Sequence, residues 1–534
     1  MIKLVHTFAR SLIFLSLTFG VYIIVGLYLL EYFQYQINLD GTAMISIAKA
    51  FKAGDFYSGI SAYWGLLYSF LLTPFLFISQ PHLMSAVKFY QLTVGFLGLL
   101  AFNRLLKVFS LNPLIEAITL LAAVPIFLYF VYYTTSVDLL FATLLLFYLS
   151  IIFNPSYSRN IINGFWCGIL GGLLFLAKEY AFYYFLGHFF LYHLLHFIST
   201  KENLLRKNIV KQFVVGITIF LVVVFFWSIL LDVKYQSPMI GARGEVNLGL
   251  TNPRFQQYPM FDQGLFPLPN PHGLSVWDDP TYLKLESWNP IGSTANLEFT
   301  KGKFLENSKL LIILLNNFSH LSVPVILIGC IVAFWNFRKL LFTKNPLFYS
   351  IITIVSFPIG YLVLLIESRY IWIISLLTLP LAAYFVSRMI DNNFFKKRRA
   401  LYLISLCLGG ILLSNFALSS AKYLKNYRYI DHTYFDQGKI LKSLNITNSK
   451  VASNDDYHHS AYILFYSDNK YLGMPKKSDD FYIYEKQLIE VDTDYFLIWN
   501  TDKFIDQFRE KYAQIQTPEI GNLYIFYLKK KQNY

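Results

Sequence analysis

The sequence has few cysteines and few charged residues. Its three cysteines, Cys167, Cys330 and Cys407, all lie in apolar segments, which excludes a disulfide framework and a cysteine-based zinc site. Charged residues make up 14% of the 534 residues, whereas hydrophobic residues make up 55% and aromatic residues 19%. Together with a mean hydropathy of +0.45, this composition indicates a polytopic membrane protein.

The sequence also lacks a P-loop, a dinucleotide fingerprint and an internal repeat, so nothing in it supports ATP-driven transport. The net charge is +13, a value that nucleic-acid-binding proteins often share. The lysines and arginines, however, cluster in short loops between apolar runs rather than on one soluble face. They therefore indicate membrane topology and not nucleic-acid binding.

Apolar runs predict about eleven membrane-spanning helices. The first, at 12–30, follows two basic residues like a signal sequence, but it is long enough to span and no small-residue cleavage site follows, so we interpret it as a retained helix. The others are expected at 86–106, 114–133, 138–153, 162–177, 180–197, 210–231, 310–334, 347–366, 370–389 and 401–418. Residues 1–424 would form this transmembrane domain, with outer loops at 32–85 and 232–308.

Lysine and arginine in the short loops predict the orientation. With the N-terminus in the cytoplasm, the inner loops carry seventeen of them and the short outer loops carry five. The long segments 232–308 and 425–534 are left out, because the positive-inside rule does not apply to large loops. This places the C-terminal segment on the periplasmic or extracellular side of a membrane, which we expect to be a bacterial inner membrane.

The first outer loop contains "NLDGTAMISIAKAFKAGDF". A short amphipathic helix on the membrane surface is predicted by apolar residues at helical spacing, namely Met44, Ile47, Ala48 and Phe51. Asp40 occupies the expected N-cap of this helix. It is either a helix cap or a carboxylate at the membrane boundary that acts as a base.

Charges also stand at two further helix ends, Asp138 in "TTSVDLL" and Lys178 with Glu179 in "LAKEYAF". A lysine at a helix end often extends to the interface, and an adjacent acid often only pairs with it. The functional alternative is a cation for a phosphate, with acids that orient a hydroxyl or bind a divalent metal.

"ESRY" places Glu367 and Arg369 at the start of a span, where charges are costly and usually functional. On a continuous helix, residues two apart would not face each other, so each needs another partner. Arg369 is expected to bind either a phosphate, through its bidentate fork, or a carboxylate that ties two helix ends together.

The segment 232–308 is longer than a connection requires and is rich in proline and aromatic residues, as in "FDQGLFPLPNPHGLSVWDDP". This composition argues against a disordered linker. It predicts either a lid over a membrane cavity that binds sugars or lipids, or a packed structural cap. Its polar and aromatic candidates are Arg243, Arg254, His272, Trp277, Asp278 and Asp279.

Residues 425–534 are expected to form a small α/β domain on the outer side. "KVAS", "DYFLIWN" and "NLYIFYL" predict strands, and "FDQGKILKSL" and "NDDYHHSAYILFY" predict helices. "NDDYHHS" contains metal-ligating residue types, but its acids occupy N-cap positions and its histidines are adjacent. This pattern favours a helix start over a metal site.

In combination, "NLDG" at the start of a large outer loop, the "KEY" junction, a long aromatic outer loop and "ESRY" at a helix start resemble the GT-C superfamily of integral-membrane glycosyltransferases. The chain is most similar to the protein O-mannosyltransferase and aminoarabinose-transferase branch. "GARGEVNLGL", "PNPHGLSVWDDP" and "SWNP" resemble an uncharacterised bacterial subgroup of that branch. The lysine and prolines that relatives often carry after the first-loop helix are replaced here by "SAYWGLLYSF".

The resemblance implies a sugar on a polyprenyl phosphate as donor, an acceptor glycan, lipid or protein on the outer face, and inversion at the sugar carbon. It maps Asp40 as the general base, with Arg369 and Lys178 as ligands of the departing phosphate. The residues expected to orient the acceptor, or to hold a divalent metal if one is used, are Asp138, Glu179 and Glu367.

Two other classes of protein fit parts of the pattern. A flippase or transporter of lipid-linked sugars would also need outer cations and a cavity, but charges or broken helices near the membrane midplane are typical of that class, and the sequence shows few of them. A non-catalytic, membrane-anchored envelope assembly protein would not need Asp40. Substitution of Asp40 therefore separates the classes.

Overall fold

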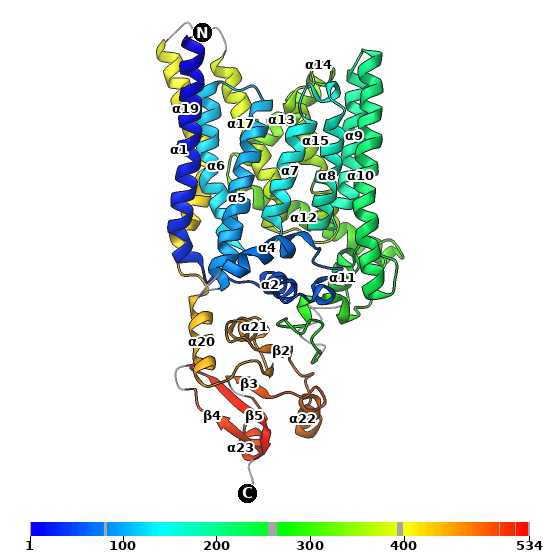
Figure 1. Ribbon diagram of the computed structural model, residues 1–534, viewed down its shortest axis with the longest axis vertical. Coiled ribbons are helices and arrows are strands. Elements are labelled where there is room, and N and C mark those ends of the chain that lie inside the picture. Colours follow the sequence, from blue (N-terminus) through cyan, green and yellow to red (C-terminus); the bar gives the residue numbers. More distant parts are fainter. Residues whose placement is uncertain are drawn as a thin grey trace.

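The computed structural model describes residues 2–78, 83–254, 264–391, 399–500, 502–517 and 520–531. A bundle of long helices forms one end of the molecule and a small sheet with its helices forms the other, with a layer of short helices between them (Figure 1). The long bundle helices are α1 (Ile2–Phe33), α5 (Leu83–Val108), α6 (Pro113–Tyr133), α9 (Ala181–Ser199), α10 (Asn203–Tyr235), α17 (Trp372–Ile390) and α19 (Arg399–Asn426). The molecule is a helical polytopic membrane protein.

Within the described residues, eight helical segments are long and apolar enough to cross a membrane, or nine if the bent pair α12 (Thr294–Phe318) and α13 (Ser322–Trp335) is one span. One of the eight combines α15 (Pro346–Ser356) and α16 (Ile359–Val363). All eleven predicted ranges fall on helices. The count is lower because α7 (Asp138–Ile152) and α8 (Ile162–Ala177) have only 15 and 16 residues, whereas a perpendicular span needs about 20.

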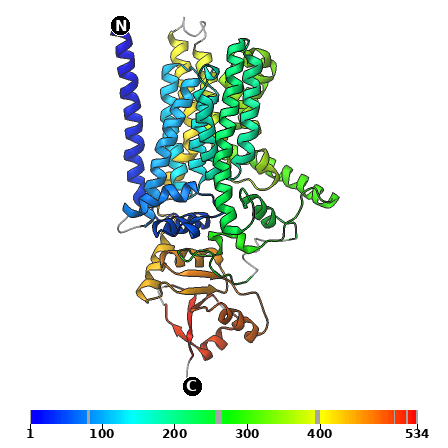
Figure 2. The same ribbon diagram turned by 45° about the vertical axis from the view of Figure 1, so that its right-hand side comes forward.

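The span predicted at 310–334 is wrong as a single helix, because α12 and α13 meet at an angle of 112°. Ser319 adopts an extended conformation at the break. Its hydroxyl accepts a hydrogen bond from the Leu321 amide (3.2 Å) and donates one to Asn415 on α19 (2.9 Å). Figure 2 shows α12 extending sideways from the bundle.

The layer of short helices lies between the bundle and the sheet (Figure 1). It contains α2 (Leu39–Lys52), α3 (Phe56–Gly59), α4 (Leu67–Ile78), α11 (Arg243–Leu250), η3 (Val276–Asp278) and η4 (Pro280–Leu283). The predicted apolar stripe of α2 is buried, but so is most of the rest, eleven of its fourteen residues. The prediction of a surface helix is corrected, because α4, η3 and the C-terminal unit cover α2.

The C-terminal unit is a five-stranded mixed sheet with the order β2-β1-β3-β5-β4. β1 (Lys450–Ser453) pairs in parallel with β2 (Lys470–Gly473) and β3 (Tyr495–Trp499), whereas β5 (Leu523–Lys531) is antiparallel to β3 and β4 (Tyr512–Ile515). Its helices are α20 (His432–Ser443), α21 (Tyr457–Tyr466), α22 (Phe481–Glu490) and α23 (Ile505–Lys511). The predicted α/β organisation and all three predicted strands are confirmed.

Two contacts fix the sheet unit against the bundle. The Ile37 amide donates to the Asp431 carboxylate (2.9 Å), and the Tyr466 hydroxyl donates to the Tyr35 carbonyl (2.8 Å). Together with direct contacts between α2 and α21, they hold the C-terminal unit against the short-helix layer. The remaining short elements are η1 (Tyr157–Arg159), α14 (Phe337–Phe342) and η5 (Ser368–Ile371).

Candidate active site

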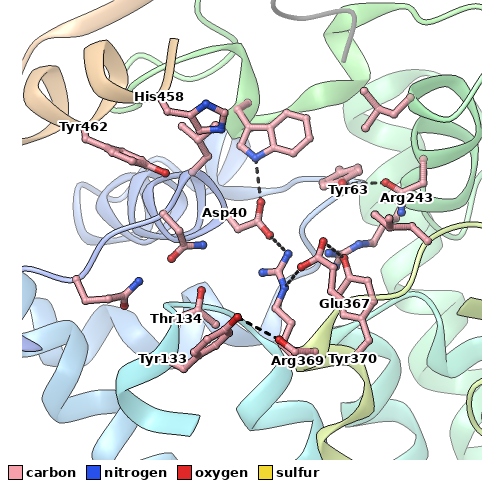
Figure 3. Close-up of a pocket in the computed structure, with 18 of the residues that line it drawn as sticks. Asp40, Tyr63, Tyr133, Thr134, Arg243, Glu367, Arg369, Tyr370, His458 and Tyr462 are labelled. Carbon is pink, nitrogen blue, oxygen red and sulfur yellow. Dashed lines mark hydrogen bonds and ion pairs between the residues drawn. The ribbon is translucent and has the colours of Figure 1, made fainter. Parts of the chain in front are cut away.

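A cavity of about 480 Å³ lies where the bundle, the short-helix layer and the C-terminal unit meet. Its walls come from the start of α2, from α11, from the segment around η3 and η5, and from α21. Figure 3 shows its polar side chains converging on Asp40 and Arg369. Segments far apart in the sequence thus place acids, cations and aromatic rings around one space.

Asp40 is the second residue of α2, and the N-cap is Asn38, so the prediction of Asp40 as N-cap is wrong. Its carboxylate points into the cavity instead (Figure 3). One oxygen lies 2.6 Å from Nη2 of Arg369 and the other accepts a hydrogen bond from Nε1 of Trp277 at 3.1 Å. Asp40 is therefore a nearly buried carboxylate, with 14% of its side chain exposed, held by partners from two distant segments.

Glu367 and Arg369 bind each other directly, with 2.7 Å between Oε2 and Nε. The expectation that they could not face each other is corrected, because "ESRY" is not a continuous helix. Glu367 is extended, and the 3₁₀ turn η5 follows it. Arg369 thereby gathers Asp40, Glu367 and Asp138 around one guanidinium, the last at 3.6 Å from Nε.

Asp138 and Lys178 form a buried ion pair at 2.7 Å, with 4% and 3% of their side chains exposed. The Lys178 ammonium also lies 3.9 Å from the ring centre of Tyr370, and burial lowers its pKa to about 8. Lys178 is not among the residues that line the cavity. Lys178 therefore contacts Asp138 and Tyr370 from outside the cavity.

Arg243 faces the cavity from the start of α11 without an ion pair among the described residues. Its guanidinium lies over the rings of Tyr63 (5.1 Å) and Trp64 (5.5 Å). It is 7% exposed, and its Nη1 has no hydrogen-bond partner in the part of the chain that the structure describes. A buried guanidinium with an unmet donor is suited to an anionic ligand.

Glu179 holds the backbone that leads into α11 rather than the cavity itself. Its Oε2 accepts a hydrogen bond from the Arg243 amide at 2.7 Å, and burial raises the pKa of its carboxyl. A Cβ at Gly241 would lie 2.6 Å from the same oxygen, so a larger residue there would displace the Glu179 carboxylate. Glu179 thus positions Arg243.

Trp277 brings the long loop to the base of the cavity. Its backbone carbonyl accepts a hydrogen bond from Nε1 of Trp64 at 2.8 Å. Asp278 next to it accepts from the amides of Leu274 (2.7 Å) and Ser275 (3.1 Å), and burial raises the pKa of this carboxyl to about 7. The segment around Trp277 is therefore part of the site wall.

Two other loop candidates lie elsewhere. Arg254 pairs with Glu286 at 2.7 Å, and both side chains are more than half exposed. His272 lies 3.3 Å from a carboxylate oxygen of Asp55. Neither lines the cavity.

Several cavity residues escaped the sequence analysis. The first loop contributes Tyr63, the end of α6 contributes Tyr133, and α21 contributes His458 and Tyr462 (Figure 3). Asn247 of α11 also lines the cavity. "NDDYHHS" drew attention as a metal pattern, and no group of three or more metal-ligating side chains occurs within the described ranges. No sequence pattern indicated that this segment faces the membrane domain.

The overall fold is similar to that of known membrane proteins. ArnT from Cupriavidus metallidurans in the apo state matches with a TM-score of 0.56 and 11% identity over 98% of both chains, and ArnT bound to undecaprenyl phosphate matches with 0.56 and 10% over 95% of this chain and 97% of that one. The archaeal oligosaccharyltransferase AglB from Archaeoglobus fulgidus, in complex with an inhibitory peptide and dolichol-phosphate, matches with 0.54 and 11% over 96% and 74%.

No family model matches the chain, and no curated protein matches it in sequence. At 10 to 11% identity the structural likeness concerns the fold. The chain has a GT-C-like fold, with a polytopic helical membrane part and a small mixed α/β sheet at the C-terminal end.

Proposed function

We propose that this protein is a membrane glycosyltransferase that moves a sugar from a polyprenyl-phosphate donor to an acceptor glycan, lipid or protein. The observation that carries the proposal is the cavity that contains the Asp40 carboxylate, the Arg369 guanidinium 2.6 Å from it, and the Arg243 guanidinium in the same lining. Glycosyl transfer needs a base for the acceptor and cations for the leaving phosphate. The similar structures in complex with undecaprenyl phosphate and dolichol-phosphate support this donor class.

In the proposed reaction, Asp40 takes the proton of the acceptor hydroxyl while the acceptor oxygen attacks the anomeric carbon of the sugar. The bond from that carbon to the phosphate oxygen breaks, and the polyprenyl phosphate leaves with the electron pair. A single displacement of this kind inverts the anomeric configuration. Trp277 orients the base through its indole N–H.

Arg243 is the strongest candidate for the donor phosphate, because it is the cavity cation without a carboxylate partner in the described chain. Arg369 is already shared among three acids, so binding the phosphate would draw it away from Asp40 and free the base. Lys178, outside the cavity lining, neutralises Asp138. The loop lysine that relatives carry would thus be replaced by Arg243.

The acids of the site are paired with cations rather than grouped as a metal-binding set. Glu367, with 38% of its side chain exposed, would orient the acceptor. Asp138, which is buried and is not among the residues that line the cavity, would orient Arg369.

The proposed orientation places the cavity and the domain formed by residues 425–534 on the outer side of a bacterial inner membrane. α1 begins at the opposite end of the bundle from the sheet (Figure 1). This arrangement agrees with a cytoplasmic N-terminus and the excess of lysine and arginine at that end. The cavity would then receive acceptors that have already crossed the membrane.

The test uses purified protein in lipid, a panel of polyprenyl-phosphate sugars and an envelope acceptor fraction, with release of free polyprenyl phosphate followed by mass spectrometry. Arg243→Gln should lower release by about a hundredfold, as expected for loss of a charged donor to the leaving group. Arg254→Gln, in an exposed ion pair of the same loop, is the matched control. Absence of release across the panel, or equal loss in both variants, would contradict the proposal.

A further inference from the structure

A second cavity, of about 540 Å³, lies beside the first one. It is enclosed by α6, α12, η5, α17 and α19. The two cavities share Tyr133, Ser368 and Tyr423. The hydroxyl groups of Ser368 and Tyr133 are 3.2 Å apart, so this hydrogen bond belongs to the shared wall.

The second cavity contains buried hydrogen-bond donors that are not satisfied. Trp372 is 3% exposed and Ser420 is 1% exposed, yet the indole Nε1 and the hydroxyl have no hydrogen-bond partner among the described residues. Buried polar groups are almost always hydrogen-bonded in folded proteins. Two unmet groups in one cavity therefore indicate a polar ligand.

The charge in this cavity selects the class of ligand. Lys422 contributes an ammonium group that forms no salt bridge with any residue that the structure describes, and no acidic residue lines the cavity. An indole N–H, a hydroxyl and a free ammonium are together suited to an anion with several acceptor oxygens, such as a phosphate.

The surroundings of the cavity are those of a lipid headgroup. Lys422 lies one turn before the end of α19 and Trp372 begins α17, and lysine and tryptophan at helix ends mark the membrane boundary. The flanking helices expose apolar side chains, Ile313 of α12 at 53% and Leu418 of α19 at 60%. A hydrocarbon chain could therefore continue from the cavity into the bilayer.

We propose that the second cavity binds the phosphate headgroup of a membrane lipid, with its chain leaving between α12 and α19. Lys422 supplies the charge, and Trp372 and Ser420 donate hydrogen bonds to the phosphate oxygens. The proposal goes beyond the transferase reaction, because binding here requires neither Asp40 nor sugar transfer. It places a second lipid phosphate one wall away from the candidate active site.

The test counts lipids bound to the full-length protein by native mass spectrometry in detergent, with titrations of polyprenyl phosphate, phosphatidylglycerol and a neutral diacylglycerol. Lys422→Gln should weaken binding of one phosphate lipid by roughly tenfold or more, the loss expected for a charged hydrogen bond. Lys425→Gln, which removes an exposed charge from the same helix outside the cavity, should leave it unchanged. Trp372→Phe should weaken binding of the same phosphate lipid.

Three results would overturn the proposal. Equal weakening by Lys422→Gln and Lys425→Gln would show general attraction to the helix end, and equal binding of the neutral lipid would exclude phosphate recognition. Inorganic phosphate that binds the cavity while phosphate lipids do not would exclude a lipid ligand. Preference for polyprenyl phosphate over phosphatidylglycerol, or the reverse, supports the proposal and identifies the source of the headgroup.

Discussion

Replacement of Arg369 by glutamine should destabilise the protein, because this guanidinium neutralises several acids in a nearly dry site. The Arg369 side chain is 11% exposed and that of its 2.6 Å partner Asp40 is 14% exposed. Removal of one partner of a buried ion pair costs about 3–5 kcal/mol. In this variant Asp138 would still be paired with Lys178, and the loss of the exposed Glu367 pair would cost no more than about 1 kcal/mol. The unpaired Asp40 carboxylate therefore accounts for most of the lost stability.

The free energy of unfolding can be measured by SDS titration in mixed micelles, followed by tryptophan fluorescence. Arg369→Gln should lose about 3–5 kcal/mol, and the double variant Asp40→Asn/Arg369→Gln should recover most of it because no unpaired charge remains. Lys303→Gln, which breaks an exposed pair with Glu306, is the control and should behave as wild type. The reasoning is refuted if Arg369→Gln is as stable as wild type, or if the double variant is no more stable than Arg369→Gln.

Three further predictions follow from single contacts. Trp277→Phe keeps the ring but removes the indole donor to the candidate base, so the transfer rate should fall about 10- to 100-fold with normal unfolding; an unchanged rate would remove Trp277 from the site. Burial raises the pKa of Asp278 to about 7, above its value in the unfolded chain, so the free energy of unfolding should fall as pH rises from about 4 to 7. If this pH dependence persists in Asp278→Asn, it belongs to another group. Gly41→Ala would place a Cβ 2.7 Å from Cβ of Thr135 and should impair transfer, whereas Gly20→Ala meets no atom within 4 Å and should not.

Hydropathy predicted the helices of the bundle because each membrane span is one continuous apolar segment. Such a segment is visible locally in the sequence. It failed at 310–334, where Pro324 in the first turn of α13 is unfavourable in a continuous helix. A hydrogen bond between Ser319 and Asn415, nearly a hundred residues apart, also lies at the break. The same limit applies to α2. Its helical stripe was visible, but the second buried face depends on α4 and η3.

The candidate site was partly visible in the sequence because charges in apolar surroundings are rare. Asp40, Asp138 and Arg369 were found in this way, and the structure brings them together. Their pairing was not predictable, since Glu367 and Arg369 meet only because the backbone is extended before η5. Arg243 stood out only as one of several loop residues, and its unmet donor becomes apparent only with the rings of Tyr63 and Trp64 in place.

The sheet unit was predicted from its strand patterns, and β1, β3 and β5 are confirmed. β2 and β4 were missed although each has four residues, the same length as β1, so strand length does not account for the difference. The placement of His458 and Tyr462 over the cavity could not be predicted, because it depends on how α21 packs on α2.

The most direct test of the central claim is the rate at which Asp40→Asn releases polyprenyl phosphate from the donor that the wild-type protein uses. Asp436→Asn, which removes a half-exposed carboxylate outside the cavity, is the control, and both variants must unfold as wild type does. If Asp40 is the base, Asp40→Asn should be slower by about 100- to 10,000-fold while the control keeps the full rate. Equal release by Asp40→Asn and wild type would show that Asp40 is a structural partner of Arg369 and not the base.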